Sequence, residues 1–160
     1  MKITTTEMEC LVARFLNWRV NLIVPNVSWG MGVHECDMLV ATKAGYLWEV
    51  EIKVTKADLK KDALKWHEHK NHKIKHLYFA IPTYLEDCIE HIPARAGIIT
   101  VAPSSETIWG RVKQLRKPET NKAAQPITPE QRYTLARLGS MRIWGLKNKI
   151  SSRELSAQSA

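Results

Sequence analysis

Two short segments rich in β-branched and apolar residues, separated by a turn-like Lys-Ala-Gly tripeptide, constrain the fold of this chain most strongly. The segments cover residues 35–42 and 46–54. Short apolar runs on either side of a glycine-containing turn are typical of a β-hairpin. Because alternate residues of a strand share a face, Glu49, Glu51 and Lys53 point to one side of the second strand. The sequence therefore predicts a hairpin with one charged face.

The charged face of this hairpin has the composition of a metal site. By the same counting, Glu35 and Asp37 share a face of the first strand, and a short turn brings Asp37 near Glu51 and Lys53. Two carboxylates and the Ile52 carbonyl are the hard oxygen ligands that Mg²⁺ accepts. Clustered carboxylates repel one another unless a cation joins them. The pattern predicts a metal site, with an amphipathic hairpin whose polar face is simply solvated as the alternative.

Helices and further strands are expected around the hairpin. Apolar residues at helical spacing predict the first helix, Pro25 marks an edge strand because it cannot donate to a ladder, and Thr55 with Asp58 forms a capping pair. The expected elements are a helix over 4–18, an edge strand over 20–27, a helix from Thr55 to about Lys70, a buried strand over 77–81 with a short helix after it, and two strands over 97–102 and 107–115.

The net charge of +8 comes entirely from the C-terminal third of the chain. Residues 1–110 carry 13 basic and 13 acidic residues, whereas residues 111–160 carry 11 basic and three acidic residues. A basic segment beside a neutral body suggests a polyanionic partner, because each neutralised phosphate releases counterions. A solubilising tail is the alternative reading.

Residues 117–129 are polar, contain three prolines and are expected to be a linker. Thr128, Pro129 and Gln131 then have the order of a helix start, so a basic helix is predicted over 130–150, with a disordered tail over 151–160. One face of this helix could grip a phosphate backbone and another could pack on the core or on a second subunit, which leaves a homodimer open. The residues concerned are Arg132, Arg137, Arg142 and Trp144 for the first role, and Leu135, Leu138, Met141 and Trp144 for the second.

The overall composition excludes several classes of protein. With 160 residues, 44% of them hydrophobic and 25% charged, the chain is an ordinary globular one. No apolar run is long enough to span a membrane and no signal peptide is visible, so we expect the cytoplasm of a bacterial cell or of a phage-infected host. The odd number of cysteines, Cys10, Cys36 and Cys88, and the lack of a CxxC motif predict reduced thiols in the core.

The order of helix, strand, hairpin with Asp37 and then Glu51-Ile52-Lys53, helix and strand resembles the core of PD-(D/E)xK nucleases. Within this superfamily, the stretch from His34 to Trp66 resembles the MmcB-like DNA-repair branch and related phage proteins. The resemblance covers residues 6–102, although Cys36 lies before Asp37 where many members have proline. It implies an α/β fold with a restriction-endonuclease-like αβββαβ core over residues 1–116, in which helices flank a mixed central sheet.

The resemblance also implies an Mg²⁺-dependent deoxyribonuclease, with Mn²⁺ as a substitute and DNA as the partner. Asp37 and Glu51 would ligate the metal together with the Ile52 carbonyl, and Lys53 would support the nucleophile. Many members place a glutamate of the first helix at the metal; Glu9 is the candidate and Glu7 the alternative, while an exposed helix charge would need no such role. His34, Glu35 and Glu49 are expected beside these ligands.

Other charged groups leave alternatives open. On the helix after the hairpin, Lys56, Lys60 and Lys61 could contact the DNA backbone or simply be solvated. The histidines of residues 67–72 do not share one helix face and form no HExxH motif, so zinc is not expected. RNA stays open as a substrate, and the rival to an enzyme is a catalytically inactive nucleic-acid-binding protein of the same fold.

Overall fold

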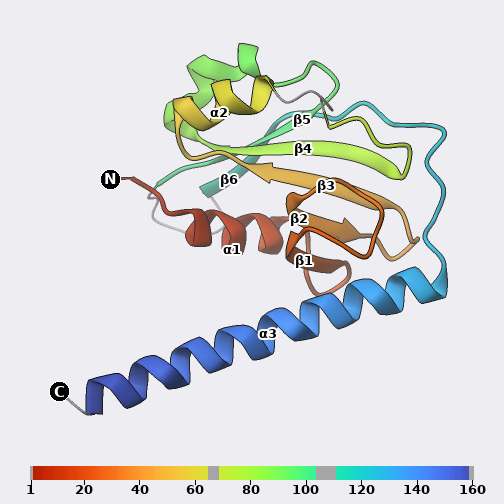
Figure 1. The fold of residues 1–160 in the computed structure, drawn as a ribbon. Helices are drawn as coiled ribbons and strands as arrows, with labels where there is room; N and C mark the ends of the chain where they lie inside the picture. The colour runs from red at the N-terminus through yellow and green to blue at the C-terminus, as the bar shows by residue number, and fades with distance from the viewer. Residues whose placement is uncertain (1, 65–68, 104–110, 159–160) are drawn as a thin grey trace.

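The computed structural model describes residues 2–64, 69–103 and 111–158, which form one six-stranded sheet with helices on both faces (Figure 1). The elements are α1 (Thr5–Phe15), β1 (Leu22–Val27), β2 (Cys36–Ala41), β3 (Leu47–Ile52), α2 (Lys56–Ala63), β4 (Ile74–Pro82), the 3₁₀ helix η1 (Thr83–His91), β5 (Gly97–Val101), β6 (Val112–Arg116) and α3 (Pro129–Gln158).

The strands lie in the sheet in the order of the chain, from β1 at one edge to β6 at the other. β1, β2 and β3 are antiparallel, β4 and β5 continue parallel to β3, and β6 is antiparallel to β5. The predicted hairpin is confirmed as β2 and β3, and Gly45 of its turn has a φ of +91°, which favours glycine. The mixed sheet and flanking helices confirm the expected restriction-endonuclease-like α/β class.

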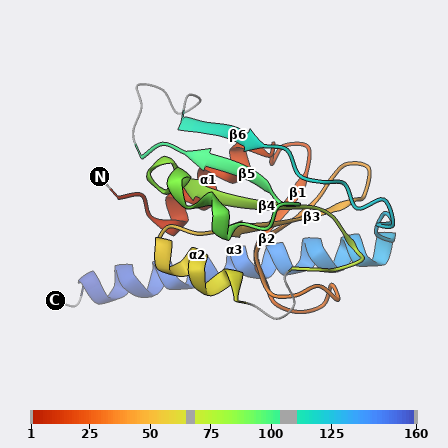
Figure 2. The ribbon, with the colours of Figure 1, turned by 90° about the horizontal axis from the view of Figure 1, so that it is seen from above.

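The two faces of the sheet are covered by different helices (Figure 2). On one face, Met8 and Val12 of α1 pack against Val50 and other residues of the central strands. On the other face, Leu59 of α2 packs with Phe79 of β4 and with η1. Both helices begin as expected, because Thr4 caps α1 and Thr55 caps α2 through their side-chain oxygens. The charged face of the hairpin is therefore the face that α2 covers.

The N-terminal half of α3 packs on the sheet. Thr128 and Gln131 form the expected reciprocal capping bonds, and Leu135 and Leu138 are buried against β1 and β2. The helix then continues past the sheet, as Figure 1 shows. It ends at Gln158, so the helix does not stop at 150 and residues 151–158 are helical rather than disordered.

Three further expectations need correction, the first being the end of α1, which lies at Phe15 instead of Trp18. α2 ends at Ala63 instead of reaching Lys70, because the chain turns and His69 adopts a left-handed φ of +55°. Residues 65–68 and 107–110, for which helix and strand were predicted, lie outside the described residues. Cys36 and Cys88 are buried thiols as predicted, but Cys10 is exposed.

The segment between β6 and α3 has no helix or strand, yet it is held to the body along its length. The backbone of Asn121 bonds to Lys75, and that of Ile127 bonds to Gly45. The side chain of Asn121 also donates to the Ile74 carbonyl at 3.0 Å. The predicted linker is therefore a strap across the end of the sheet. No helix in the described part of the chain is long and apolar enough to cross a membrane.

Two glycines of α3 predict opposite effects of alanine. A Cβ at Gly145 would meet nothing within 4 Å, whereas one at Gly139 would lie 3.2 Å from Val24. Gly145→Ala should therefore stabilise the protein by about 0.5–1 kcal/mol through its higher helix propensity. Gly139→Ala should gain less or lose stability, because the helix and β1 would have to separate. Urea unfolding of both variants checks this, and a destabilised Gly145→Ala variant would contradict it.

Candidate active site

The charged residues of the hairpin are buried at one place on the sheet. Leu39 faces Glu49 in the register of β2 and β3, and Glu51 faces Phe79 of β4. Glu49 and Glu51 are 0% and 2% exposed, and Lys53, just after β3, is 9% exposed. Burying charges is costly unless they are paired and hydrogen-bonded. The solvated amphipathic hairpin is therefore excluded for these residues.

Lys53 is surrounded by carboxylates. Its Nζ lies 2.5 Å from Oε2 of Glu51, 3.3 Å from Oδ1 of Asp62 and 3.5 Å from Oδ2 of Asp37. The same oxygen of Asp37 accepts a 2.7 Å hydrogen bond from the Ile52 amide. Burial alone would lower the pKa of Lys53, but Glu51, Asp37 and Asp62 raise it above its ordinary value. Lys53 is therefore a fixed ammonium charge at neutral pH.

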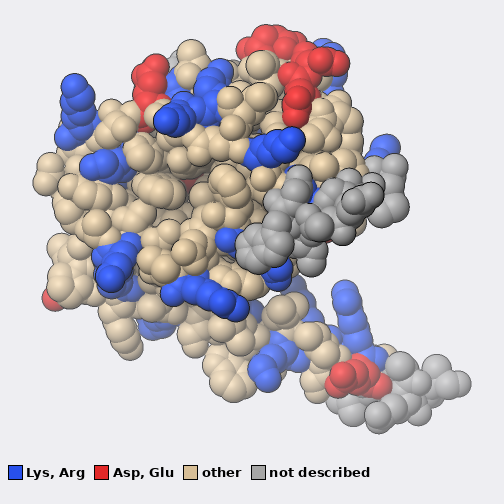
Figure 3. Space-filling model, turned by 180° about the vertical axis from the view of Figure 1, so that it is seen from behind, with Lys and Arg blue, Asp and Glu red and all other residues tan. Residues whose placement is uncertain are grey.

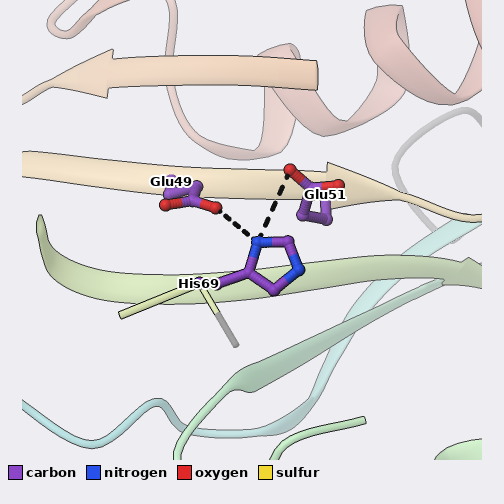
Figure 4. A group of neighbouring side chains, drawn as sticks. All are labelled: Glu49, Glu51 and His69. Atoms are coloured by element: carbon purple, nitrogen blue, oxygen red, sulfur yellow. Dashed lines mark hydrogen bonds and ion pairs between the residues drawn. The ribbon is translucent and has the colours of Figure 1, made fainter. Parts of the chain in front are cut away.

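A second buried cation, His69, lies beside Glu49 and Glu51 of the same cluster (Figure 4). It donates through Nδ1 to Oε1 of Glu49 and through Nε2 to Oδ2 of Asp62, at 2.7 Å each. Burial alone would lower the pKa of His69, but these two hydrogen bonds and the charge of Glu51 raise it to about 9. The imidazole is therefore protonated at neutral pH, and it links α2 to β3 through carboxylates on both sides.

An open groove of about 450 Å³ reaches this cluster from solvent. Asp37, Lys53 and Asp62 lie at its wall together with Ile52, and Lys61 of α2 lies at the same groove. Glu49 and Glu51 lie deeper, because they are almost fully buried. A substrate in the groove could thus contact Asp37 and Lys53 directly.

The cluster suits an additional cation. Four carboxylates, those of Asp37, Glu49, Glu51 and Asp62, share the two cations Lys53 and His69. Oε2 of Glu49 is buried and receives no hydrogen bond from the described residues. Burial raises the pKa of Glu51, as does the charge of Asp37, although Lys53 opposes both. An ion would relieve this excess of negative charge.

Two sets of residues could hold such an ion. Glu49, Glu51 and His69 each offer a ligand atom within 4.8 Å of the others, and this buried group could bind a metal ion. Both nitrogens of His69 already donate to carboxylates, so an ion there would have to displace a proton. Asp37 and Glu51 form the outer set beside the Ile52 backbone, and only this set includes a residue at the open groove.

The sequence profile of a family described as "DNA repair protein MmcB-like" matches residues 4–147 of this chain. The chain belongs to the MmcB-like family. Membership implies a role in DNA repair and, with it, interaction with DNA. A similar solved structure is the SPO1766 protein of unknown function from Silicibacter pomeroyi, with a TM-score of 0.62, 18% identity and 96% of each chain covered. This likeness supports the fold alone. Among curated proteins, none matches the chain.

In this MmcB-like protein the two glutamates of α1 differ in their surroundings. Glu7 accepts a 2.6 Å bond from Arg111, which also bonds to the carbonyls of Ala102 and Pro103. Glu9 is partly buried, and burial, followed by the negative charge of Asp37, raises its pKa. The charge of Asp37 acts on Glu9, whereas Glu7 is paired with Arg111. Glu9 is therefore the better candidate to bind a metal beside Asp37, and it stays the predicted ligand.

The remaining predicted residues lie around the cluster or far from it. Glu35 is exposed and His34 partly buried in the loop before β2, and Lys56, Lys60 and Lys61 are exposed on α2. The three arginines of α3 that were predicted to contact nucleic acid have contacts with the rest of the protein. Arg132 donates to the Thr42 and Lys43 carbonyls, Arg142 donates to the Asn26 carbonyl, and Arg137 lies 5.6 Å from the Trp29 ring. Their contact with nucleic acid stays a prediction.

Sequence reasoning did not identify Asp62 and His69 as members of the cluster. Asp62 lies three residues after Leu59, so both occupy the buried face of α2. An acidic residue on the apolar face of a predicted helix was the signal that could have identified Asp62. The sequence pattern considers His69 only together with His67 and His72, which do not share a helix face and predict no zinc site. His72 is exposed and His67 lies outside the described residues, whereas His69 is buried beside Glu49.

The raised pKa of His69 predicts that the stability of the fold depends on pH. In the folded protein the pKa is about 9, against an ordinary value of 6.5. The stabilisation is therefore complete below about pH 6.5, declines as the pH rises and is lost above about pH 9. In EDTA, the free energy of unfolding should fall by on the order of 3 kcal/mol between about pH 6 and pH 10. A His69→Gln variant should lose this dependence; if it kept the full slope, another group would be responsible.

Proposed function

We propose that this MmcB-like protein is a metal-dependent deoxyribonuclease that hydrolyses phosphodiester bonds during DNA repair, with Mg²⁺ as cofactor and Mn²⁺ as a substitute. The observation that carries the proposal is the position of Lys53. Its ammonium group lies between Asp37 and Glu51 at the wall of an open groove, and burying such a charge costs free energy that an apolar side chain in its place would not. Buried, charged groups beside a groove are typical of catalytic sites.

Each residue has a role that its position supports. Asp37 and Glu51 would hold the ion with the Ile52 carbonyl and Glu9, and the bound ion would supply a Lewis acid and a water of lowered pKa. Lys53 keeps its proton, so it would orient the attacking water or neutralise a phosphate oxygen rather than act as a base. Lys61 at the groove, with Lys56 and Lys60 on the same exposed side of α2, would hold the DNA backbone.

Cleavage assays with defined DNA substrates test the proposal. Labelled single-stranded, duplex and branched DNA should be cut in Mg²⁺ or Mn²⁺ and left intact in EDTA. Ca²⁺, which takes similar ligands but is a poorer Lewis acid, should support binding with little cutting. Salt-sensitive binding of all three substrates without cutting in either metal would instead support an inactive nucleic-acid-binding protein that uses the basic region after residue 110.

A further inference from the structure

A second groove lies between the edge strand β1 and α3, away from the charged cluster. We call it the β1–α3 groove; it has a volume of about 930 Å³ and is lined by residues 22–26 of β1 and by α3 residues between 136 and 149. Leu22, Ile23, Val24 and Pro25 form its strand side. α3 approaches β1 closely at Gly139, where a Cβ would lie 3.2 Å from Val24, and at Gly145 a Cβ would meet nothing within 4 Å. The groove therefore widens along α3.

The helix beyond this point exposes large apolar side chains. Ile143 and Leu146, at the groove, are 58% and 61% exposed, and Trp144 is 63% exposed. Met141 and Ile150 are also about half exposed, at 50% and 47%. Soluble proteins rarely expose contiguous apolar surface of this kind unless another molecule covers it. The groove and the projecting helix together therefore have the character of an interaction surface.

The charge of the surface restricts what can cover it. All charged residues between Glu130 and Glu154 of α3 are basic. Figure 3 shows Lys and Arg side chains on the projecting helix. The first acidic residue after Glu130 is Glu154. A second copy of the chain would bring the same cations to the interface, which disfavours a homodimer here. The cations between these two acids are Arg132, Arg137, Arg142, Lys147, Lys149 and Arg153.

The shape of the groove favours a helix as its occupant. Strand addition to β1 is obstructed, because Pro25 has no amide hydrogen and the Asn26 carbonyl already accepts from Arg142. The wall formed by α3 extends from residue 136 to residue 149, which is about 20 Å at 1.5 Å per residue. A helix of about 13 residues has this length. Its apolar side chains would cover Ile143 and Leu146, which phosphates of DNA cannot do.

We propose that the β1–α3 groove binds an amphipathic helix of a partner protein, with its apolar face on Ile143, Leu146 and the partly buried Leu22 and with acidic residues beside Arg142 and Lys149. Such helix-in-groove binding uses anchors at positions i, i+3, i+4 and i+7. The proposal does not depend on nuclease activity, because the groove shares no lining residue with the groove at Lys53.

A labelled model peptide tests the groove in the full chain. The probe is an amphipathic helical peptide of about 13 residues with leucine anchors and glutamates on its flanks; the matched control peptide has lysine in place of glutamate. The acidic peptide should bind, and Ile143→Ser and Leu146→Ser should each weaken binding by at least about tenfold. Lys149→Glu should weaken binding of the acidic peptide and allow the lysine peptide to bind. Leu115→Ser, at a half-exposed apolar residue on β6 outside the groove, should change nothing.

Four results would overturn the proposal. Equal affinity for the acidic and basic peptides would remove the charge argument. Concentration-dependent dimerisation abolished by Ile143→Ser would make a second copy the occupant. Displacement of the peptide by single-stranded DNA would assign the surface to nucleic acid. Binding of phosphatidylserine vesicles that requires Ile143 and Leu146, without peptide binding, would assign it to a membrane.

Discussion

Replacing Lys53 with methionine should lower DNA cleavage by about 10³-fold, the effect typical of removing one pre-organised stabiliser of transition-state charge. Methionine keeps an unbranched stem in the site but removes the ammonium group that lies 2.5 Å from Glu51 and 3.5 Å from Asp37. Binding of Mn²⁺, measured by calorimetry, should be unchanged or tighter, because a positive charge beside the metal ligands has been removed. Loss of cutting with metal binding retained would distinguish a role in the reaction from a role in holding the metal.

The controls separate this effect from loss of structure. Lys113, an exposed lysine of β6, offers the matched substitution, and Lys113→Met should cut at the wild-type rate. Circular dichroism should show that Lys53→Met is folded at the assay temperature. Glu51→Gln should lose metal binding and cleavage together. Cleavage by Lys53→Met at the wild-type rate would rule out the assigned role of Lys53.

Replacing His69 with alanine should destabilise the fold by about 3–5 kcal/mol, because it removes one partner of buried ion pairs and leaves the others charged. Glu49 and Asp62 would each lose a 2.7 Å hydrogen bond while remaining almost fully buried. Much of the loss is the cost of keeping the Glu49 and Asp62 carboxylates buried after each has lost one hydrogen-bond donor. Urea unfolding near pH 7 in EDTA measures the difference.

His72→Ala is the control for this measurement. His72 lies three residues further along the chain, its side chain is exposed, and the substitution should change stability by less than about 0.5 kcal/mol. Adding Mn²⁺ to both proteins then tests the buried group of Glu49, Glu51 and His69. If that group is the metal site, the stabilisation by Mn²⁺ should disappear in His69→Ala; if Asp37 and Glu51 are the ligands, it should persist.

The hairpin and its charged face were predictable from the sequence, because both follow from short-range rules. Alternation along a strand puts Glu49, Glu51 and Lys53 on one face whatever surrounds them. The glycine of the turn and the capping threonines act within four residues. The helix starts at Thr4, Thr55 and Thr128 were accordingly correct, whereas the ends of α1, α2 and α3 were not. Helix ends depend more on what the last turns pack against.

The sequence by itself determined that three charged groups would lie together in an otherwise apolar strand, with Asp37 on the neighbouring strand. Only the tertiary structure decided which groups neutralise them. Asp62 reaches Lys53 because α2 packs on the sheet at that place, and His69 lies beside Glu49 although 20 residues separate them in the chain. Glu7 is paired with Arg111, which lies 104 residues away in the sequence. Ion pairs between distant segments depend on the packing of whole elements, which no local pattern of residues encodes.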